Sequence, residues 1–312
     1  MRLNNVSGEW AVSKQKVEES GVFAVVYGPS KTGKSTATGA AGAAGLFIAQ
    51  PGGLLPITNY LGLSGVEYLA PTNVQEASKI VRDNAGKHPT IVVDDFSLLV
   101  EQTIQQLEKK HSFGDMWRAL RHQVLEMRDA ARTATAKKTH VIFNCHQSPP
   151  KTSSGKYVRG GPQLPGQLPE QFSAFADVVA RVKYDATAAP WKYILRTGPD
   201  AEYISGDRLD IFPDPAPINV GEALRCAGYD IPRAKGLEWM EGVVNDLSSL
   251  VLKNDILEWR TTLKPAAEKL RKKYELPHVR WAIQDSLHRA VLLNAKNNLL
   301  DNLFAEENLE EW

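Results

Sequence analysis

The sequence predicts an α/β fold whose central sheet is mainly parallel, with a helical region appended at its C-terminal end. Short runs of β-branched residues alternate with helical stretches between residues 21 and 145, which is the pattern of βαβ units. A glycine-rich loop directly follows the first of these runs, where a strand should pass into a helix. Beyond about Gly236 the apolar residues recur at helical spacing instead. We therefore expect a sheet covered by helices, followed by a helical appendage.

The composition excludes several classes of protein. Hydrophobic residues make up 43% of the 312 residues and charged residues 23%, which rules out wholesale disorder and allows a large core. Two cysteines, Cys145 and Cys226, cannot build a disulfide framework, so a reducing cytoplasm is the expected location. No apolar run reaches the roughly 18 residues of a membrane span, so we expect no membrane partner. Because the net charge is only +1, any basic surface has to be local.

The elements of the sheet can be predicted in chain order. Residues 1–20 are polar and mixed, and we expect an N-terminal strand or arm there. Apolar, β-branched runs predict strands at Val22–Tyr27, Leu46–Ala49, Thr90–Val93, His140–Cys145, Val178–Lys183 and Lys192–Arg196. Residues 117–131 carry apolar side chains at helical spacing, which predicts a helix before the fourth strand. Ten of the 18 prolines lie between Pro149 and Pro217, so loops and short strands should dominate that stretch.

The C-terminal part is expected to form a helical region of residues 236–312, appended to a core of residues 1–235. Apolar residues recur at helical spacing from Met240 to Val251 and again from about Val279 to Phe304. We interpret these segments as a packed appendage, with an interaction surface as the minority interpretation. The acidic tail that ends in Trp312 is expected to be solvated, although it also looks like a docking segment for a replication protein.

Gly28–Ser35 fit the phosphate-loop pattern G-x-x-x-x-G-K-[ST] at every fixed position. Gly28 and Gly33 let the backbone curl so that successive N–H groups point at phosphate oxygens, and the following helix adds its positive end. Lys34 would neutralise the β- and γ-phosphates, and the Ser35 hydroxyl would ligate Mg²⁺. The sequence thus predicts a site for ATP and Mg²⁺ built from Gly28, Pro29, Ser30, Lys31, Thr32, Gly33, Lys34, Ser35 and Thr36.

A second acidic element is needed beside such a loop, and the run Thr90–Phe96 supplies it. Residues of strand type are followed by Asp94 and Asp95, where the strand should emerge at its carboxyl end. We expect Asp94 to hold Mg²⁺ through water. Asp95 has two interpretations of nearly equal weight: it orients the attacking water, or it caps the helix expected over Phe96–Leu107.

A third strand ends in polar residues. The run from His140 to Cys145 leads into His146 and Gln147. On a parallel sheet this end lies near the phosphate loop, so His146 or Gln147 could sense the γ-phosphate; the alternative is a structural histidine. Cys145 has no partner pattern of a cysteine nucleophile, so we expect a buried structural thiol.

These elements, in this order and spacing, resemble the core of the RecA-type ATPases. More narrowly, the chain resembles the phage-encoded RecA-like ATPases associated with single-strand annealing and recombination. The segments that carry the resemblance are Gly28–Ser35, Ile91–Phe96, His140–Gln147, Gly160–Gly166, Ala176–Val182, Gly206–Arg208 and Asn219–Gly228. It covers roughly residues 21–232 and implies an ATPase that binds single-stranded DNA and assembles into a ring or filament of identical subunits. It also implies a host-cell cytoplasm as the location, and a single-strand-binding or replication protein as a partner.

One departure from that family concerns catalysis. RecA-type cores place a catalytic glutamate at the end of the strand after the phosphate-loop helix, and here Gln50 stands at that position. A glutamine can orient water but cannot accept its proton, so Asp95 or Glu101 would have to substitute. The resemblance therefore implies slow turnover, consistent with ATP used to switch states.

The family's DNA-binding loop follows the third strand, and Gln147–Gln163 occupies that place. Gln147–Pro169 contains Lys151, Lys156 and Arg159, no acidic residue, and a stacking side chain in Tyr157. Such interleaving of basic and aromatic residues is typical of sequence-tolerant single-strand binding. Glycines 155, 160 and 161 predict a loop that DNA would order, and an ordinary solvated loop is the alternative.

RecA-type sites commonly lie between subunits, where a basic residue of the neighbour stabilises the transferring phosphoryl group. Lys183, Arg196 and Arg208 are the candidates for this trans-acting role, and exposed ion-pair partners are the equally weighted alternative. For the whole chain, a DNA-dependent ATPase is the leading hypothesis. An AAA-type helicase loader or another phage DNA motor is the alternative, and a small-molecule phosphotransferase is the third.

Overall fold

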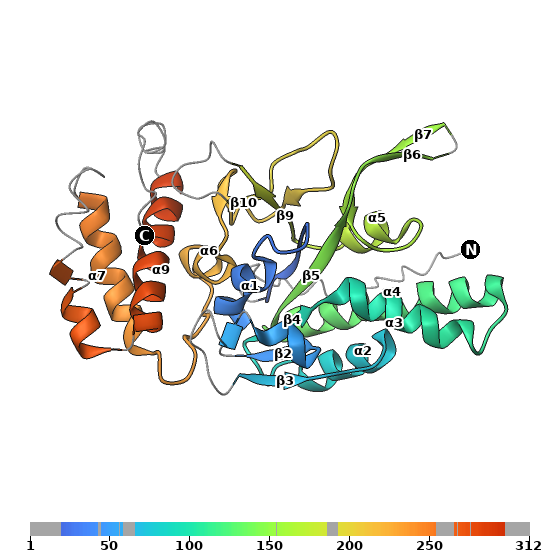
Figure 1. The fold of residues 1–312 in the computed structure, drawn as a ribbon, viewed down its shortest axis with the longest axis horizontal. Coiled ribbons are helices and arrows are strands. Elements are labelled where there is room, and N and C mark those ends of the chain that lie inside the picture. The colour runs from blue at the N-terminus through green and yellow to red at the C-terminus, as the bar shows by residue number, and fades with distance from the viewer. Residues whose placement is uncertain are drawn as a thin grey trace, which may run out of the picture.

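The computed structural model describes residues 20–42, 45–55, 57–58, 66–153, 155–185, 193–253, 265–266, 268–274 and 276–296. The expected N-terminal arm before residue 20, the acidic tail and the last residues of the second C-terminal segment lie outside these ranges. Figure 1 shows a sheet in the middle of the molecule, with α2, α3 and α4 on one side and α1 and α6 on the other.

The sheet has the predicted mainly parallel topology. Its strand order is β12-β10-β9-β1-β5-β4-β2-β3, and the path from β9 to β3 is parallel throughout. The strands on this path are β9 (Val178–Tyr184), β1 (Phe23–Gly28), β5 (His140–Ser148), β4 (Thr90–Asp94), β2 (Leu46–Ala49) and β3 (Glu67–Leu69). Antiparallel additions are β10 (Tyr193–Arg196), β12 (Ala216–Pro217), β11 (Gly206–Asp207) and β8 (Gly161–Pro162). Each strand predicted from an apolar run is present, with ends shifted by up to three residues.

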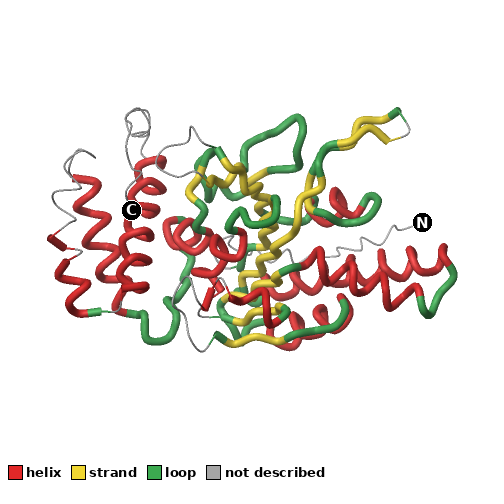
Figure 2. Tube along the Cα trace, viewed as in Figure 1, coloured by secondary structure: helices red, strands yellow, loops and turns green. Residues whose placement is uncertain are grey.

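Helices cover both faces of the sheet because alternate strand residues are apolar on both sides. Phe23, Val25 and Tyr27 of β1 pack into the core under α2 to α5, whereas Ala24 and Val26 pack toward α1 and α6. The helices on the first face are α2 (Val74–Asn84), α3 (Phe96–Glu108), α4 (Phe113–Ala136) and α5 (Leu168–Ser173). Those on the second face are α1 (Lys34–Gly42) and α6 (Val220–Cys226), and the 3₁₀ turn η2 (Pro51–Leu54) follows β2. Figure 2 shows this layering by element type.

The C-terminal helices α7 (Trp239–Lys253) and α9 (Leu276–Lys296) agree with the two predicted segments. They pack on each other and, through α9, on α6 and the second face of the sheet, where Trp281 and Leu292 join its apolar cluster. Beside them Glu222 is completely buried and bonds to Arg225, Arg233 and Arg289. No helix in the described part of the chain is long and apolar enough to cross a membrane.

Candidate functional site: a phosphate loop beside two strand-end acids

The phosphate loop lies where β1 passes into α1, and its two glycines are required for different reasons. Gly33 has φ +86°, a left-handed conformation that side chains disfavour. A Cβ on Gly28 would lie 2.9 Å from the Val182 carbonyl oxygen of β9, so only glycine allows the neighbouring strand to approach this closely. Both glycines are therefore required by the backbone of the loop, and phosphate binding at the loop stays a prediction.

Lys34 is held at the loop itself. Its Nζ donates hydrogen bonds to the carbonyl oxygens of Gly28 (3.1 Å) and Pro29 (2.8 Å), and the residue is 8% exposed. Burial lowers the pKa of Lys34, and the carboxylates of Asp95 and Asp94 oppose that shift. A buried ammonium next to curled backbone N–H groups is the electrostatic arrangement expected for a polyphosphate.

Asp94 ends β4 in a buried polar chain. Its Oδ1 accepts a hydrogen bond from Asn144 Nδ2 (3.1 Å), which also donates to Thr38 Oγ1 (2.8 Å). Asp94 also bonds to the Ser35 side chain, and burial raises its pKa. The other oxygen, Oδ2, is buried without a hydrogen-bond partner among the described residues.

That unpaired oxygen, on the carboxylate that interacts with the Ser35 side chain, fits the predicted Mg²⁺ ligands, because Mg²⁺ needs oxygen donors and a buried carboxylate oxygen needs a donor group or a cation. The described residues hold no cluster of three or more metal-ligating side chains. Mg²⁺ at this place would therefore need phosphate oxygens or water as further ligands, as is usual in nucleotide sites. Asn144 is a site residue that the sequence analysis did not single out; the signal is a buried amide inside an apolar strand.

Asp95 is the N-cap of α3, as one of the two sequence interpretations holds. Its Oδ1 accepts hydrogen bonds from the backbone N–H groups of Ser97 (3.0 Å) and Leu98 (3.4 Å). Its Oδ2 lies 2.5 Å from His146 Nε2, and His146 Nδ1 lies 3.4 Å from Ser30 Oγ in the phosphate loop. His146 thus connects the loop to the acid at the end of β4. Because both Asp95 oxygens are engaged, a role for Asp95 as a free base is disfavoured.

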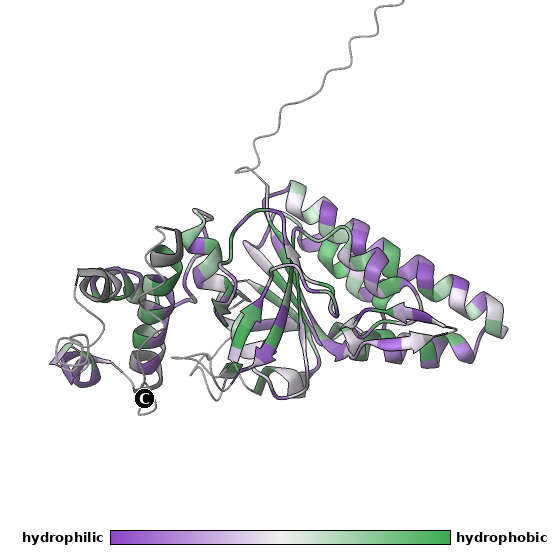
Figure 3. Ribbon diagram, turned by 90° about the horizontal axis from the view of Figure 1, so that it is seen from above, coloured by the Kyte–Doolittle hydropathy of each residue, from purple (hydrophilic) through white to green (hydrophobic). Residues whose placement is uncertain are grey.

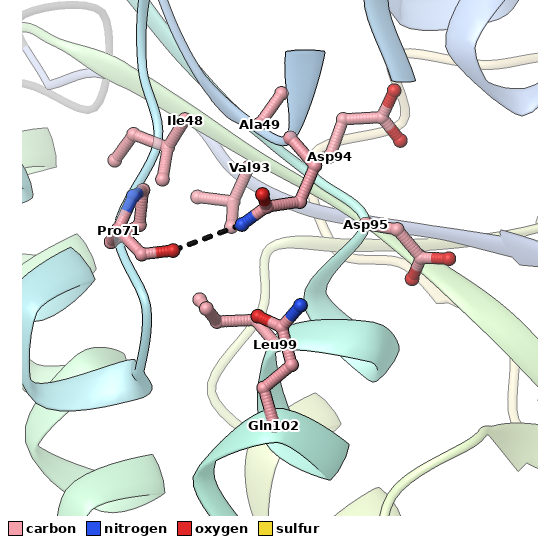
Figure 4. A pocket seen from close by; sticks show the side chains of 9 residues that line it. Ile48, Ala49, Pro71, Val93, Asp94, Asp95, Leu99 and Gln102 are labelled. Atoms are coloured by element: carbon pink, nitrogen blue, oxygen red, sulfur yellow. Dashed lines mark hydrogen bonds between the residues drawn. The ribbon is translucent and has the colours of Figure 1, made fainter. Parts of the chain in front are cut away.

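Gln50 lies at the end of β2, next to β4, and lines a small cavity with Asp94 and Asp95. Its Nε2 donates to the Pro71 carbonyl oxygen (3.0 Å), the bond marked in Figure 4. Gln102 of α3 lines the same cavity, and its Oε1 is buried without a hydrogen-bond partner among the described residues. Figure 4 shows the Gln102 side chain rising from α3 toward the strand ends, beside Leu99. The sequence analysis missed Gln102, since nothing local marks one glutamine of a helix.

Other predicted residues lie apart from this cavity. Glu101 is exposed and does not line the cavity; its Oε1 accepts a bond from Gln163 Nε2 (3.3 Å), and the Gln163 backbone N–H donates to the His146 carbonyl oxygen near the end of β5 (2.7 Å). Gln147 Oε1 accepts a bond from Arg181 Nε (3.1 Å), and the Arg181 guanidinium lies 3.3 Å from the centre of the Tyr203 ring. Cys145 is fully buried, which raises the pKa of its thiol and agrees with a structural role.

The segment predicted as a DNA-binding loop forms a hairpin in its middle part. Strands β6 (Lys151–Ser153) and β7 (Lys156–Val158) pair antiparallel, and Figure 1 shows them projecting from the body beyond the end of β5. Lys151, Lys156 and Tyr157 are exposed, Tyr157 at 56%. Arg159 follows the hairpin, 3.8 Å from Glu170.

Gly160 and Gly161 do not have the role that the prediction of a mobile loop gave them. A Cβ on Gly160 would lie 2.6 Å from the Tyr203 ring, and one on Gly161 would lie 2.8 Å from the Ile204 side chain. These glycines allow close packing at the base of the hairpin, so they anchor it. Gly155 at the tip has φ +74° and serves the turn.

The three candidates for a trans-acting cation all have partners within the chain. Lys183 Nζ lies 3.4 Å from Asp185 Oδ2, and Arg196 makes bonds of 2.7 and 3.3 Å to the Asp214 carboxylate. Arg208 donates from a terminal guanidinium nitrogen to the Ala174 carbonyl oxygen (2.5 Å). The contacts of Lys183 and Arg196 agree with the ion-pair interpretation, whereas the Arg208 bond is to a backbone carbonyl. The role toward a neighbouring subunit stays a prediction for all three.

A family model described as an AAA domain matches residues 20–209, which is more than half of the chain. The chain belongs to this AAA domain family. The matched range holds the phosphate loop, both strand-end acids and His146, so this AAA domain is a P-loop NTPase with a RecA-like α/β core. No curated protein matches the sequence significantly.

Solved structures with a similar fold include the RadB recombinase, with 15% identity over 57% of this chain and 81% of that chain and a TM-score of 0.36. The flagellar accessory protein FlaH from Methanocaldococcus jannaschii has 13% identity over 61% and 80%, with a TM-score of 0.37. A KaiC-like protein from Pyrococcus horikoshii has 15% identity over 57% and 78%, with a TM-score of 0.36.

Proposed function

We propose that this AAA domain protein binds ATP with Mg²⁺, hydrolyses it slowly and acts on single-stranded DNA in phage-type annealing or recombination. The observation that carries the proposal is the path of β5. His146 near the end of this strand contacts Ser30 of the phosphate loop, and a few residues later the same chain forms the exposed basic hairpin β6–β7. One segment thus connects the nucleotide site to a surface suited to single strands.

Residues of the described site account for the proposed ATP binding and for slow ATP hydrolysis. The curled loop and Lys34 would hold the phosphates, and Ser35 with Asp94 would hold Mg²⁺, which supplies charge neutralisation when bound. Gln50 and Gln102 flank the cavity beside Asp94 and can orient a water molecule, but neither amide accepts its proton. Turnover limited by the missing carboxylate base follows from this geometry.

The proposed switch acts through His146. Its two ring nitrogens face Ser30 and Asp95, so a γ-phosphate at the loop would compete for the same groups. Its backbone N–H donates to Ser97 Oγ of α3 (3.0 Å), which fixes the strand at this point. A rearrangement of His146 would be felt in the next residues, Gln147 and Ser148, which pair with β8 at the base of the hairpin.

ATPase rates with and without single-stranded DNA test the function, and hairpin variants test the DNA site. Replacing Lys151, Lys156 and Arg159 together by Ala should weaken single-strand binding and flatten its salt dependence, because phosphate contacts release counterions. Nucleotide binding without DNA should be retained. The matched control replaces Lys79, Lys87 and Lys137, exposed cations of α2 and of the loops before β4 and β5.

The experiments distinguish an error in the proposed DNA site from an error in the proposed function. Unchanged affinity and salt slope in the hairpin variant, with binding intact in the wild type, would remove the hairpin as the DNA site. A wild-type protein that binds ATP but neither binds single strands nor responds to them would instead favour the second candidate, an AAA-type helicase loader or other DNA motor. The family description as an AAA domain supports that candidate equally.

A further inference from the structure

The first residues of α4, directly after the turn from α3, carry an exposed aromatic pair. Phe113 is 79% exposed, the highest value for a large hydrophobic side chain among the described residues, and Trp117 is 37% exposed. Their ring centroids are 6.0 Å apart and the planes are inclined by 81°. Met116 and Leu120, their neighbours in α4, face the core instead. Neither the nucleotide site nor the β6–β7 hairpin uses it.

Basic residues lie on both sides of this pair in the sequence. Lys109, Lys110 and His111 are exposed directly before it, and neither lysine has an ion-pair partner among the described residues. Arg118, with a side chain 84% exposed, follows Trp117, 3.4 Å from Asp115. Asp115 also accepts a bond from the Ser112 hydroxyl (2.7 Å), so local groups already compensate this acid.

We propose that this turn, residues 109–118, is a second binding site for single-stranded nucleic acid. Exposed aromatic faces can stack on bases, and neighbouring lysines can pair with phosphates, which is the combination that sequence-tolerant single-strand binding uses. A protein partner is disfavoured by the same residues, because lysine is depleted in protein–protein interfaces even where aromatic residues are enriched. The inference rests on the proposed function, since both sites take the same strand.

The position of the turn supports a shared strand. In Figure 1 the α3–α4 pair extends to the same end of the molecule as the β6–β7 hairpin, and the view from above in Figure 3 agrees. Both protrusions carry exposed aromatic and basic side chains, Tyr157 with Lys156 on one and Phe113 with Lys110 on the other. A strand long enough to pass both would gain contacts that a short strand cannot make.

The first experiment measures affinity as a function of strand length. Binding of oligothymidylates of about 5 to 50 nucleotides spans the site sizes of single-strand proteins. Replacing Phe113 and Trp117 together by Ala should weaken binding of long strands by about tenfold or more, the loss of one or two stacked bases, and leave the shortest strands unaffected. The control replaces Tyr184 and Tyr193, another exposed T-shaped pair with centroids 5.3 Å apart on β9 and β10.

A charge variant keeps the test informative should the aromatic variant lose stability. Lys109→Gln with Lys110→Gln should reduce the salt slope for long strands by up to about two counterions. Photo-crosslinking of wild-type protein to an iododeoxyuridine strand gives a direct readout. Trypsin cuts after Lys110 and Arg118, so a crosslink at this turn appears on the peptide of residues 111–118.

Each outcome bears on one claim. Length-dependent loss together with a crosslinked 111–118 peptide supports the second site. Wild-type affinities in both turn variants, or crosslinks confined to residues 152–159, would overturn it while leaving the hairpin site intact. A change of oligomeric state by light scattering, with strand binding unchanged, would instead make the turn a contact between protein subunits. No single-strand binding by the wild type would remove the proposed function itself.

Discussion

Asp94, the predicted Mg²⁺ ligand, carries a cost in the free protein. It is 6% exposed, its Oδ2 has no hydrogen-bond partner among the described residues, and burial raises its pKa. Burial therefore disfavours the ionised carboxylate, the Lys34 ammonium offsets part of that penalty, and a bound cation would offset more of it. The pKa of Asp94 is higher in the folded than in the unfolded protein, so its ionisation lowers the free energy of unfolding. This penalty is fully present at pH values above the folded pKa and disappears as the pH falls toward the ordinary aspartate pKa.

Asp94→Asn should therefore stabilise the free protein at pH 7, by about 1–3 kcal/mol in free energy of unfolding. The gain should shrink as the pH falls toward about 4. Urea unfolding measures both effects. In the presence of Mg²⁺ and ATP the order should reverse, since wild type gains binding free energy that the variant loses. A variant less stable than wild type at neutral pH would contradict this account of the carboxylate.

Gln50→Glu tests whether the cavity beside Asp94 holds the attacking water. The change adds a carboxylate at the end of β2, in a cavity whose other carboxylates, Asp94 and Asp95, are already engaged in hydrogen bonds. We expect the ATP turnover number to rise, by about tenfold or more for a positioned general base. The control Gln105→Glu adds the same charge on the exposed side of α3. Unchanged turnover in Gln50→Glu, with ATP affinity retained, would transfer the positioning role to Gln102, whose Oε1 faces the cavity.

Local residue patterns predicted the phosphate loop, Asp94 and the N-cap at Asp95, because each depends on residues close in sequence. Contacts across strands could not be predicted in this way. Asn144 reaches Asp94 only because β5 lies between β1 and β4, and the sequence does not give the strand order. Gln102 likewise acquires its place from the packing of α3 under β2 and β4.

At the scale of elements, the β6–β7 hairpin shows a different limit. The described side chains of its strands are exposed on both sides, so there is no alternation of buried and exposed residues, and the prolines before them suggest a loop. Gly160 and Gly161 look like loop residues until Tyr203 and Ile204 are seen to pack on them. The helix α4 was easier to predict, since it buries one apolar stripe.

The attachment of α9 to α6 depends on a buried ionic cluster. Arg289 bonds to Glu222 Oε2 and to Glu241 Oε1, both at 2.7 Å, and Glu222 is completely buried. Arg289→Met should lower the free energy of unfolding by about 3–5 kcal/mol, because it leaves buried negative charge undercompensated. Arg118→Met, which breaks the exposed pair with Asp115, should cost less than about 1 kcal/mol. Equal costs in urea unfolding would show that the cluster does not hold the C-terminal helices.

For the whole molecule, the open question is whether the nucleotide site is complete within one chain. Three cations of the core are engaged within the chain: Lys34 with its own loop, Arg196 with Asp214, and Arg181 with Gln147. Arg208 is exposed, and its guanidinium donates to the backbone carbonyl oxygen of Ala174 rather than to a carboxylate. Among the three predicted trans-acting residues it is therefore the one whose charge is least compensated within the chain.

If subunits share the site, mixing Lys34→Ala protein with Arg208→Ala protein should restore part of the activity that each lacks alone. An arginine supplied by a neighbouring subunit acts on the transferring phosphoryl group. In a randomly mixed assembly, up to about one quarter of the subunit interfaces would pair an intact phosphate loop with an intact arginine. Lys31→Ala in place of Arg208→Ala is the control, because Lys31 is exposed on the loop of the same chain. ATPase rates across the mixing ratio decide the matter: recovery that peaks near equal amounts supports a shared site, and a straight line between the two variants excludes Arg208 from it.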